Sequence, residues 1–381
     1  MTARVLGIGT ALPATLLRQE QVADMLASQP GMDRRARRLV TAAFAGADIR
    51  TRYTVLPELG GEHGGLHILE DGLLLSPSTG RRNDEFRRSA PPLFAAASRD
   101  ALAAAGVPAE AVTHVVTVSC TGLMAPGPDY ALVRDLGLPV TVQRDHVGFV
   151  GCAAALPALR LAARITAAEP DAVVLVATAE LCSLHVRSSP DPEQIVAASL
   201  FADGAAAAVV SADPSRVPGR HYELDGFATR LSESGERDMR WTVGDEGFEM
   251  TLTPAVPRII GDEVAAVVDE VFGGTGAVDA WAVHPGGRAI LDRVESALAV
   301  GTTALETSRR VLRDHGNMSS ATVLFVLATM LADPDRPDGQ RVGALAFGPG
   351  LTVEAARIVL RDGVTPAAPG RRPQDARVVA R

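Results

Sequence analysis

Short apolar segments alternate with longer amphipathic or apolar segments along most of the chain. Apolar runs bounded by Gly, Pro or Asp predict strands at residues 4–10, 113–120, 171–181, 205–212, 279–287 and 341–350. Helical segments are predicted at residues 93–106, 152–168, 257–273, 288–300 and 319–333. Strands that alternate with helices of this length predict an α/β fold with a mostly parallel sheet.

Two segments do not follow this alternation. Residues 55–90 are rich in Gly and charge and show little periodicity, so they predict an exposed excursion. Residues 364–381 are rich in Pro and Arg and predict a mobile tail.

In both halves of the chain, a similar number of residues separates the end of a strand from the start of a later helix. In the first half, a strand ends at Cys120 and a helix begins at Cys152. In the second half, a strand ends at His284 and a helix begins at Asn317. Sequence identity between the halves is slight, but in an α/β layer both elements of each pair point to one region. The predicted units are therefore residues 1–215 and 216–363.

Composition narrows the class of protein. Among the 381 residues, 47% are hydrophobic and 22% are charged, which is typical of a globular protein with a large core. The net charge of −8 argues against a nucleic-acid partner. No apolar run reaches the ~18 residues of a membrane span, and the first residues do not resemble a signal peptide. Three cysteines without paired spacing form no disulfide framework, so we expect a cytoplasmic protein.

Cys152, His284 and Asn317 are the candidate chemical groups. A helix that begins at Cys152 would lower the pKa of its thiol, although Pro157 should cost that helix a hydrogen bond. An imidazolium at His284 would stabilise the thiolate further, and the Asn317 amide could join His284 in holding an oxyanion.

Each of these residues taken alone also has an ordinary structural explanation. Cys152 could fill the core, His284 could be a turn residue, and Asn317 could cap a helix. Their matched places in the two halves favour acyl transfer through a thioester over these separate explanations.

Four segments carry a resemblance to a known family: "LFADGAAAAVV", "HPGGRAILD", "GNMSSATVLF" and "AFGPGLTVE". With them, the chain resembles the type III polyketide synthases, the chalcone-synthase-like branch of the thiolase superfamily, and in particular the bacterial members. The resemblance runs from "VLGIGTALP" to "LTVEAARIVL". It implies a five-layered αβαβα thiolase fold of two similar halves, a homodimer, and a Cys152–His284–Asn317 triad.

The resemblance also implies a reaction. Cys152 takes an acyl group from an acyl-CoA, and malonyl-CoA loses CO₂ to give an enolate that His284 and Asn317 hold. The enolate attacks the Cys152 thioester, and repeated rounds lengthen the chain. Backbone N–H groups of Cys152 and of the Phe347–Gly350 loop could hold the tetrahedral oxygen, and Gly348 and Pro349 of this loop are expected to contact substrate. No metal or redox cofactor is implied.

Further positions match the cavity of the family. The residues expected to contact substrate are Cys120, Thr121, Cys182, His185, Phe201, Trp241, Phe248, Met250 and Ser319. The candidates for binding CoA are Arg37, Arg38, Arg50 and Ala289. Alternatives remain open: Phe248 and Met250 could be strand core, Trp241 could cover a surface loop, His185 could be a core histidine, and the arginines could form a solvated face.

The aromatic Trp241 beside Met250 disfavours a plant-like phenylpropanoid starter. The pattern is nearer to bacterial enzymes that extend fatty acyl starters to alkylresorcinols or alkylpyrones. Three alternatives remain: a synthase of the tetrahydroxynaphthalene or phloroglucinol type that is primed by malonyl-CoA, a single-condensation 3-oxoacyl-(acyl-carrier-protein) synthase III, and a catalytically silent thiolase-fold subunit that only binds a partner.

Overall fold

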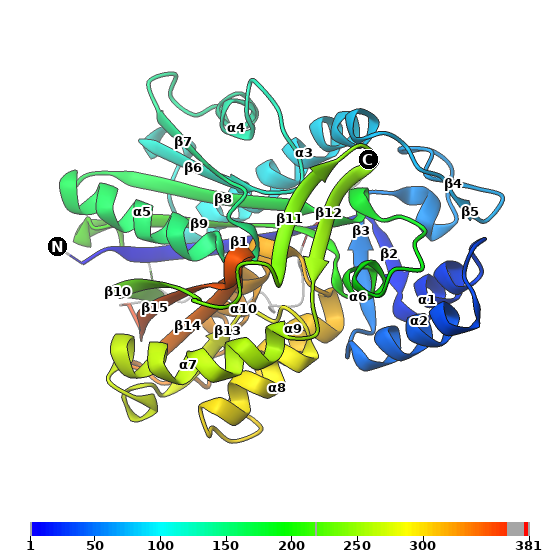
Figure 1. The fold of residues 1–381 in the computed structure, drawn as a ribbon. Helices are drawn as coiled ribbons and strands as arrows, with labels where there is room; N and C mark the ends of the chain where they lie inside the picture. Colours follow the sequence, from blue (N-terminus) through cyan, green and yellow to red (C-terminus); the bar gives the residue numbers. More distant parts are fainter. Residues whose placement is uncertain (1, 218, 364–376, 380–381) are drawn as a thin grey trace.

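One continuous sheet crosses the whole molecule (Figure 1). The computed structural model describes residues 2–217, 219–363 and 377–379. The strand order is β13-β14-β15-β10-β1-β9-β8-β6-β7, and β16 pairs with β1 outside this path. The strands are β1 (Arg4–Pro13), β6 (His114–Ser119), β7 (Gln143–Gly148), β8 (Val173–Leu181), β9 (Asp203–Ser211), β10 (His221–Leu231), β13 (Ala280–Val283), β14 (Arg341–Gly348), β15 (Thr352–Arg361) and β16 (Arg377–Val379). All six predicted strands are confirmed.

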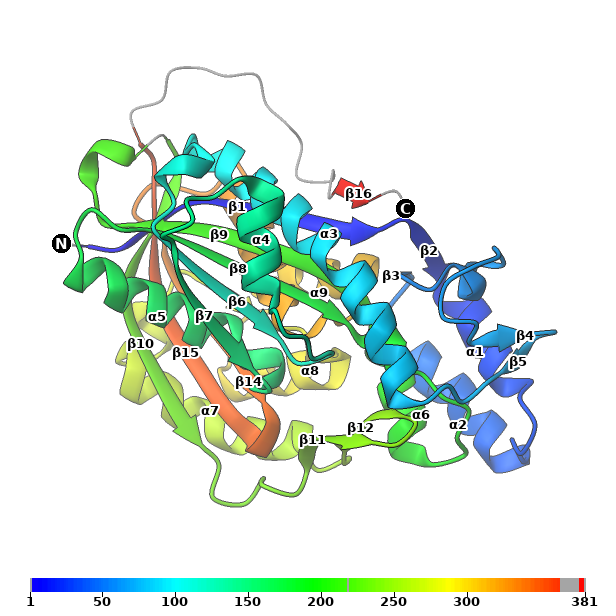
Figure 2. The same ribbon diagram turned by 90° about the horizontal axis from the view of Figure 1, so that it is seen from above.

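Smaller elements gather at one end of the sheet and around it. The two-stranded sheets pair β2 (Thr15–Arg18) with β3 (Thr51–Thr54), β4 (Leu69–Glu70) with β5 (Leu73–Leu74), and β11 (Met239–Gly244) with β12 (Gly247–Leu252). The helices are α1 (Gln19–Ala27), α2 (Arg34–Gly46), α3 (Thr79–Ala105), α4 (Pro128–Leu136), α5 (Ala155–Ala168), α6 (Pro192–Leu200), α7 (Val256–Phe272), α8 (Arg288–Ala297), α9 (Glu306–His315) and α10 (Thr322–Leu331). Figure 2 shows α1, α2 and strands β2–β5 grouped at one end, beside α6.

The prediction of a mostly parallel sheet is wrong. Parallel pairing joins β6 to β7 and β8, and β13 to β14. Antiparallel pairing joins β1 to β9 and β10, β8 to β9, and β15 to β10 and β14. The turn between β14 and β15 is too short to hold a crossover helix, so those two strands must run in opposite directions. Apolar runs reveal strands but not their directions.

The two halves of the continuous sheet lie on either side of α5 and α10, so the molecule has the five layers that the family resemblance implies. The helices α5 and α10 share one hydrophobic core with strands of both halves, through residues such as Leu156, Leu159, Val323 and Leu327. A second core lies between α3 and the strands of the first half, and a third lies between α7, α8 and the strands of the second half. The predicted αβαβα arrangement is confirmed, with α3 above the sheet and α7 and α8 below it in Figure 1. Because α5 and α10 are covered on both sides, their sequences are apolar over most of the helix surface.

The prediction that residues 55–90 form an exposed excursion is wrong for its last third. Helix α3 begins at Thr79, and the Ser78 side chain caps it by accepting a hydrogen bond from the Arg81 amide. Arg82 and Phe86 are fully buried on this helix. Buried positions recur every three or four residues along α3, but charged residues and prolines lie between them. The sequence therefore does not show the apolar periodicity of a helix there.

The predicted tail at residues 364–381 lies outside the described residues, apart from 377–379 in β16, which pairs with Ala11–Pro13 of β1. Within the part of the chain that the structure describes, every helix is too short or too polar to cross a bilayer.

Candidate active site

Cys152 lies where the chain enters the central helix α5. It occupies a 3₁₀ turn, η3 (Gly151–Ala153), and its side chain is 7% exposed. The sequence predicts that the helix begins at Cys152, but it begins three residues later, at Ala155. Pro157 is therefore the third residue of α5, where a backbone N–H has no partner within the helix. The hydrogen-bond cost predicted for this proline does not arise.

Asn317 holds the corresponding place before α10 and connects several parts of the site. Its Oδ1 accepts a hydrogen bond from the Ser319 amide at 2.9 Å, and its Nδ2 donates to the Gly286 carbonyl at 3.3 Å. These partners fix which end of the amide carries the N–H₂ group. The side chains of Asn317 and Ser319 also reach the Cys152 thiol. Asn317 thus fixes the turn before α10 and is also a hydrogen-bond partner of the thiol.

His284 follows β13, and its backbone N–H donates to the Leu345 carbonyl at 2.7 Å. The side chain is 1% exposed, and neither ring nitrogen has a hydrogen-bond partner among the described residues. Burial lowers the pKa of His284 to about 3, because the charged imidazolium loses its hydration. The predicted imidazolium is therefore wrong, because a ring with this pKa is neutral at neutral pH. Two buried, unpartnered nitrogens suit a group that enters with a substrate.

The prediction of a lowered thiol pKa is also wrong. Burial raises the pKa of Cys152 to about 11, although hydrogen bonds from Ser319 and Asn317 act in the opposite direction. Removal of the thiolate from water outweighs the local donors, and the helix begins too late for Cys152 to be its first residue. These pKa directions leave both the thiol and the imidazole neutral at neutral pH.

Glu180 is a site residue that the sequence analysis missed. It is fully buried at the end of β8, and burial raises the pKa of its carboxyl. Ser320 and Thr121 donate to it at 2.5 and 2.9 Å, and the Cys120 amide donates at 3.0 Å. The Cys120 sulfur lies 3.5 Å from the Ser319 hydroxyl, so this network reaches the neighbour of the Cys152 thiol. The sequence signal that could have indicated this site residue is a charged glutamate within the mostly apolar segment "VVLVATAEL".

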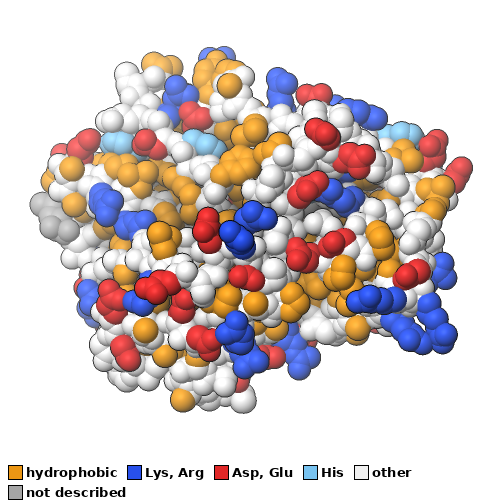
Figure 3. Space-filling model, in the orientation of Figure 1, with side chains coloured by type: hydrophobic (Ala, Val, Ile, Leu, Met, Phe, Trp, Pro, Cys, Tyr) orange, Lys and Arg blue, Asp and Glu red, His pale blue; other side chains and the backbone are white. Residues whose placement is uncertain are grey.

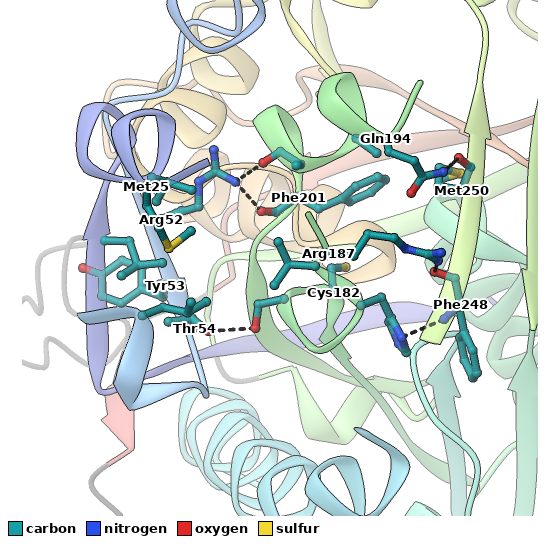
Figure 4. Close-up of a pocket in the computed structure, with 18 of the residues that line it drawn as sticks. Met25, Arg52, Tyr53, Thr54, Cys182, Arg187, Gln194, Phe201, Phe248 and Met250 are labelled. Carbon is teal, nitrogen blue, oxygen red and sulfur yellow. Dashed lines mark hydrogen bonds between the residues drawn. The ribbon is translucent and has the colours of Figure 1, made fainter. Parts of the chain in front are cut away.

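Most of the predicted cavity residues lie together. One pocket is lined by Cys182, His185, Phe201, Trp241, Phe248 and Met250, several of which are labelled in Figure 4. Its lining also includes Leu17, Val22, Met25 and Leu59. Cys120, Thr121 and Ser319 belong to the hydrogen-bond network around Glu180. Gly348 and Pro349 pack so closely against the η3 turn that Gly348 and Gly151 have no room for a side chain.

A buried arginine positions Phe201, and the sequence analysis missed it. Arg52 of β3 donates to the carbonyls of Phe201 and Ala198 at 2.8 and 2.7 Å and to that of Ser199 at 2.9 Å. These are carbonyls at the end of α6, which a helix leaves without internal partners. Figure 4 shows the guanidinium directed at this helix end. Burial lowers the pKa of Arg52 to about 9, which leaves it mostly charged at neutral pH.

A second pocket opens on the other side of the His284 loop. Its wall includes Gly286, Gly287 and Ala289 of that loop and of α8, and Ala42 and Gly46 of α2. Of the four residues predicted to bind CoA, only Ala289 lines it. Arg37 and Arg38 are exposed nearer the start of α2, where blue side chains gather at the lower right of Figure 3. Arg50 pairs with Asp314 at 3.1 Å.

Family models cover nearly the whole described chain. The N-terminal domain model of the chalcone and stilbene synthases matches residues 1–214, and the C-terminal domain model matches residues 228–362. Both halves of the sheet, with Cys152 in the first and His284 and Asn317 in the second, lie inside these matches.

Individual relatives agree with the family models. Bisdemethoxycurcumin synthase of Oryza sativa subsp. japonica is 33% identical, over 93% of this chain and 91% of that protein. The alpha-pyrone synthesis polyketide synthase-like Pks18 of Mycobacterium tuberculosis is 32% identical, over 91% of this chain and 88% of that protein. Probable polyketide synthase 1 of Dictyostelium discoideum is 30% identical over 92% of this chain, which spans only 11% of that protein's length.

A solved structure of the same kind has nearly the same fold. The C-terminal type III polyketide synthase domain of Steely1, a type I/III hybrid from Dictyostelium, superimposes with a TM-score of 0.85 at 29% identity, over 94% of this chain and 99% of that domain. The layers, the two central helices and the matched segments agree with this likeness. The chain therefore belongs to the chalcone and stilbene synthase family, and it is an acyltransferase of the type III polyketide synthase kind with a thiolase-like fold.

Proposed function

We propose that this enzyme extends a fatty acyl starter from acyl-CoA with several malonyl-CoA units and releases an alkylpyrone or alkylresorcinol. The observation that carries this proposal is the lining of the pocket in Figure 4. Leu17, Val22 and Met25 line it beside Phe201 and Cys182, together with the polar residues Arg52 and Arg187. Both guanidinium groups already donate to backbone carbonyls, so an apolar chain can enter this pocket without taking their partners away. The name of the Mycobacterium relative, which refers to alpha-pyrone synthesis, is in accord with this product class.

In the proposed mechanism, the Cys152 sulfur attacks the acyl-CoA carbonyl while His284 takes the thiol proton and passes it to the leaving CoA thiolate. Malonyl-CoA then loses CO₂, and the electrons of the broken C–C bond form an enolate. His284 and the Nδ2 group of Asn317 hold the enolate oxygen. Its carbon attacks the Cys152 thioester, so that a C–C bond forms and the C–S bond breaks. Decarboxylation supplies the driving force, so the chemistry requires no metal or redox cofactor.

The starter can be identified directly. Purified enzyme is incubated with malonyl-CoA and equal concentrations of acetyl-, hexanoyl-, dodecanoyl- and 4-coumaroyl-CoA, and products are identified by mass. We expect dodecanoyl products to dominate. Products built from malonyl-CoA alone would instead favour an enzyme primed by malonyl-CoA, and a single extension in every case would favour a 3-oxoacyl synthase. Either result would overturn the fatty acyl proposal.

Trp241→Gly should lengthen the products. The indole lines the pocket and its Nε1–H donates to the Cys120 carbonyl at 2.6 Å, so it forms part of the wall nearest the reacting groups. Its removal opens space for several methylenes, and the relative rate for a starter one methylene longer should rise about tenfold. Competition between acyl-CoAs of neighbouring length measures this change. Trp241→Phe, which keeps a ring there, is the matched control. A lowered melting temperature with an unchanged product spectrum would exclude a role of Trp241 in chain length.

We also propose that the enzyme is a homodimer. β7 lies at one end of the sheet, its residues from Gln143 to His146 are exposed, and Phe149 just beyond it is 39% exposed. An exposed edge strand beside an exposed aromatic ring is a surface on which a second copy can pair. Light scattering after gel filtration should give twice the chain mass of 39.7 kDa, and Arg144→Pro in β7 should shift the mass toward one chain. A monomer at micromolar concentration would contradict the proposal.

A further inference from the structure

The hairpin of β11 and β12 forms one wall of the pocket but belongs to no larger sheet. Its two strands pair only with each other within the described chain, and three of its residues, Trp241, Phe248 and Met250, line the pocket. Hydrogen bonds to Thr79, at the start of α3, anchor the turn of the hairpin. Along the strands the hairpin is held by side chains: Gln194 donates to the Met250 carbonyl at 3.0 Å, and Arg187 donates to the Phe248 carbonyl at 3.2 Å. Figure 4 shows Arg187 and Gln194 approaching the strand that carries Phe248 and Met250. Away from the anchored turn, the position of this wall depends on the side chains that hold it.

His185 spans the gap between the hairpin and the main sheet, as the Trp241 indole also does through its hydrogen bond to the Cys120 carbonyl. Its Nε2 lies 2.9 Å from the Thr121 carbonyl, directly after the end of β6, and its Nδ1 lies 3.0 Å from the Phe248 amide. The carbonyl can only accept and the amide can only donate, so Nε2 carries the proton and Nδ1 does not. Burial lowers the pKa of His185 to about 3, so the ring is neutral at neutral pH. The His185 ring thus bridges the end of β6 to β12.

The same ring orders the aromatic wall. It stacks on Phe248 with ring centroids 4.3 Å apart and an interplanar angle of 11°, and it meets Trp241 edge-on at 5.5 Å. Trp241 and Phe248 also meet edge-on, at 5.8 Å. At Gly247, where φ is +111°, an added side chain would lie 3.3 Å from Nδ1 of His185, so the backbone comes close to the ring there. His185 is therefore in contact with both aromatic residues of the hairpin that line the pocket.

From this arrangement we propose that His185 is a positioning residue that sets the width of the polyketide cavity by fixing the β11–β12 hairpin to the end of β6. The inference rests on the proposed function only for the identity of the cavity's occupant. It differs from a role as a substrate contact, because both polar atoms of the ring are already used by the backbone. The chain length of the product should therefore change when the two hydrogen bonds of His185 are lost. It should not depend on a direct contact between His185 and the substrate.

Two substitutions separate the hydrogen bonds from the ring. His185→Gln places a donor and an acceptor about as far apart as the two ring nitrogens, so it can bridge Thr121 and Phe248 without an aromatic ring. His185→Phe keeps an aromatic ring for Phe248 and Trp241 but bonds to neither backbone group. We expect His185→Gln to keep the product distribution of the unmodified enzyme. His185→Phe should shift the ratio of products that differ by one extension about tenfold, toward the longer chain.

A second measurement does not depend on catalysis. In a Trp281→Phe background, Trp241 is the only remaining tryptophan, and acrylamide quenching of its fluorescence reports how firmly the hairpin is held. We expect quenching to be unchanged in His185→Gln and about twofold stronger in His185→Phe, below the melting temperature of each variant. Equal quenching and equal products in both variants would overturn the positioning role, and so would a His185→Gln variant that behaves like His185→Phe. If the unmodified enzyme forms no polyketide at all, the proposed function fails, while the quenching comparison still tests the hairpin contact.

Discussion

Cys152→Ala should abolish polyketide formation, with a loss on the order of 10⁴-fold or more, because no other group can carry the acyl chain. The other two thiols, Cys120 and Cys182, are buried, and burial raises the pKa of both well above the usual value. Neither lies in the turn before a central helix, and the Cys120 thiol donates a hydrogen bond to the Glu180 carboxyl. A substitute nucleophile at the same distance from Asn317 is therefore absent from the described residues.

Cys152→Gln distinguishes loss of the nucleophile from loss of the site. The glutamine amide has the carbonyl of an acyl-enzyme but no leaving group, so condensation should cease while malonyl-CoA still loses CO₂. Release of CO₂ and formation of acetyl-CoA measure this residual reaction, and mass analysis of products measures condensation. Polyketide formation by Cys152→Ala at the normal rate would move the nucleophile to another residue. Loss of decarboxylation in Cys152→Gln, with an unchanged melting temperature, would contradict the role given to His284 and Asn317.

The positions of the three proposed catalytic residues could be predicted because they follow from local pattern. Cys152 and Asn317 each precede a long apolar segment, and His284 ends an apolar run before a Pro-Gly-Gly turn. Helices that are apolar over most of their surface must lie between two layers, so their starts meet at the centre of the molecule. The structure bears this out, since the turns before α5 and α10 are in contact.

What could not be predicted depends on residues far apart in the sequence. The raised pKa of Cys152 comes from burial by layers of both halves, which no local pattern contains. Arg52 is separated from the end of α6 by nearly 150 positions, and in sequence it resembles any arginine of a surface strand. The directions of β9, β10 and β15 depend on how the chain returns through the sheet. Each of these errors concerns long-range packing, where short-range periodicity carries no information.

Removing the amide of Asn317 should slow decarboxylation about 10²- to 10³-fold, which is the usual effect of one lost oxyanion donor. His284→Ala should cost a similar factor, because its ring is neutral and supplies at most one N–H to the enolate oxygen. Both effects are best measured as CO₂ release from malonyl-CoA in the Cys152→Gln background, where no condensation follows and the proposed proton transfer from Cys152 is not needed.

Asn317→Asp is the informative companion to Asn317→Ala. An aspartate keeps the acceptor for the Ser319 amide, so the turn before α10 keeps this hydrogen bond, but it replaces the N–H₂ donor by an oxygen that repels the enolate. We therefore expect Asn317→Asp to melt near the unmodified protein and yet to decarboxylate at least as slowly as Asn317→Ala. If Asn317→Asp instead retained nearly full decarboxylation while Asn317→Ala lost both activity and stability, Asn317 would only stabilise this turn. The donor for the enolate would then have to be sought elsewhere, and the Nδ2 group that faces Gly286 would have only a structural function.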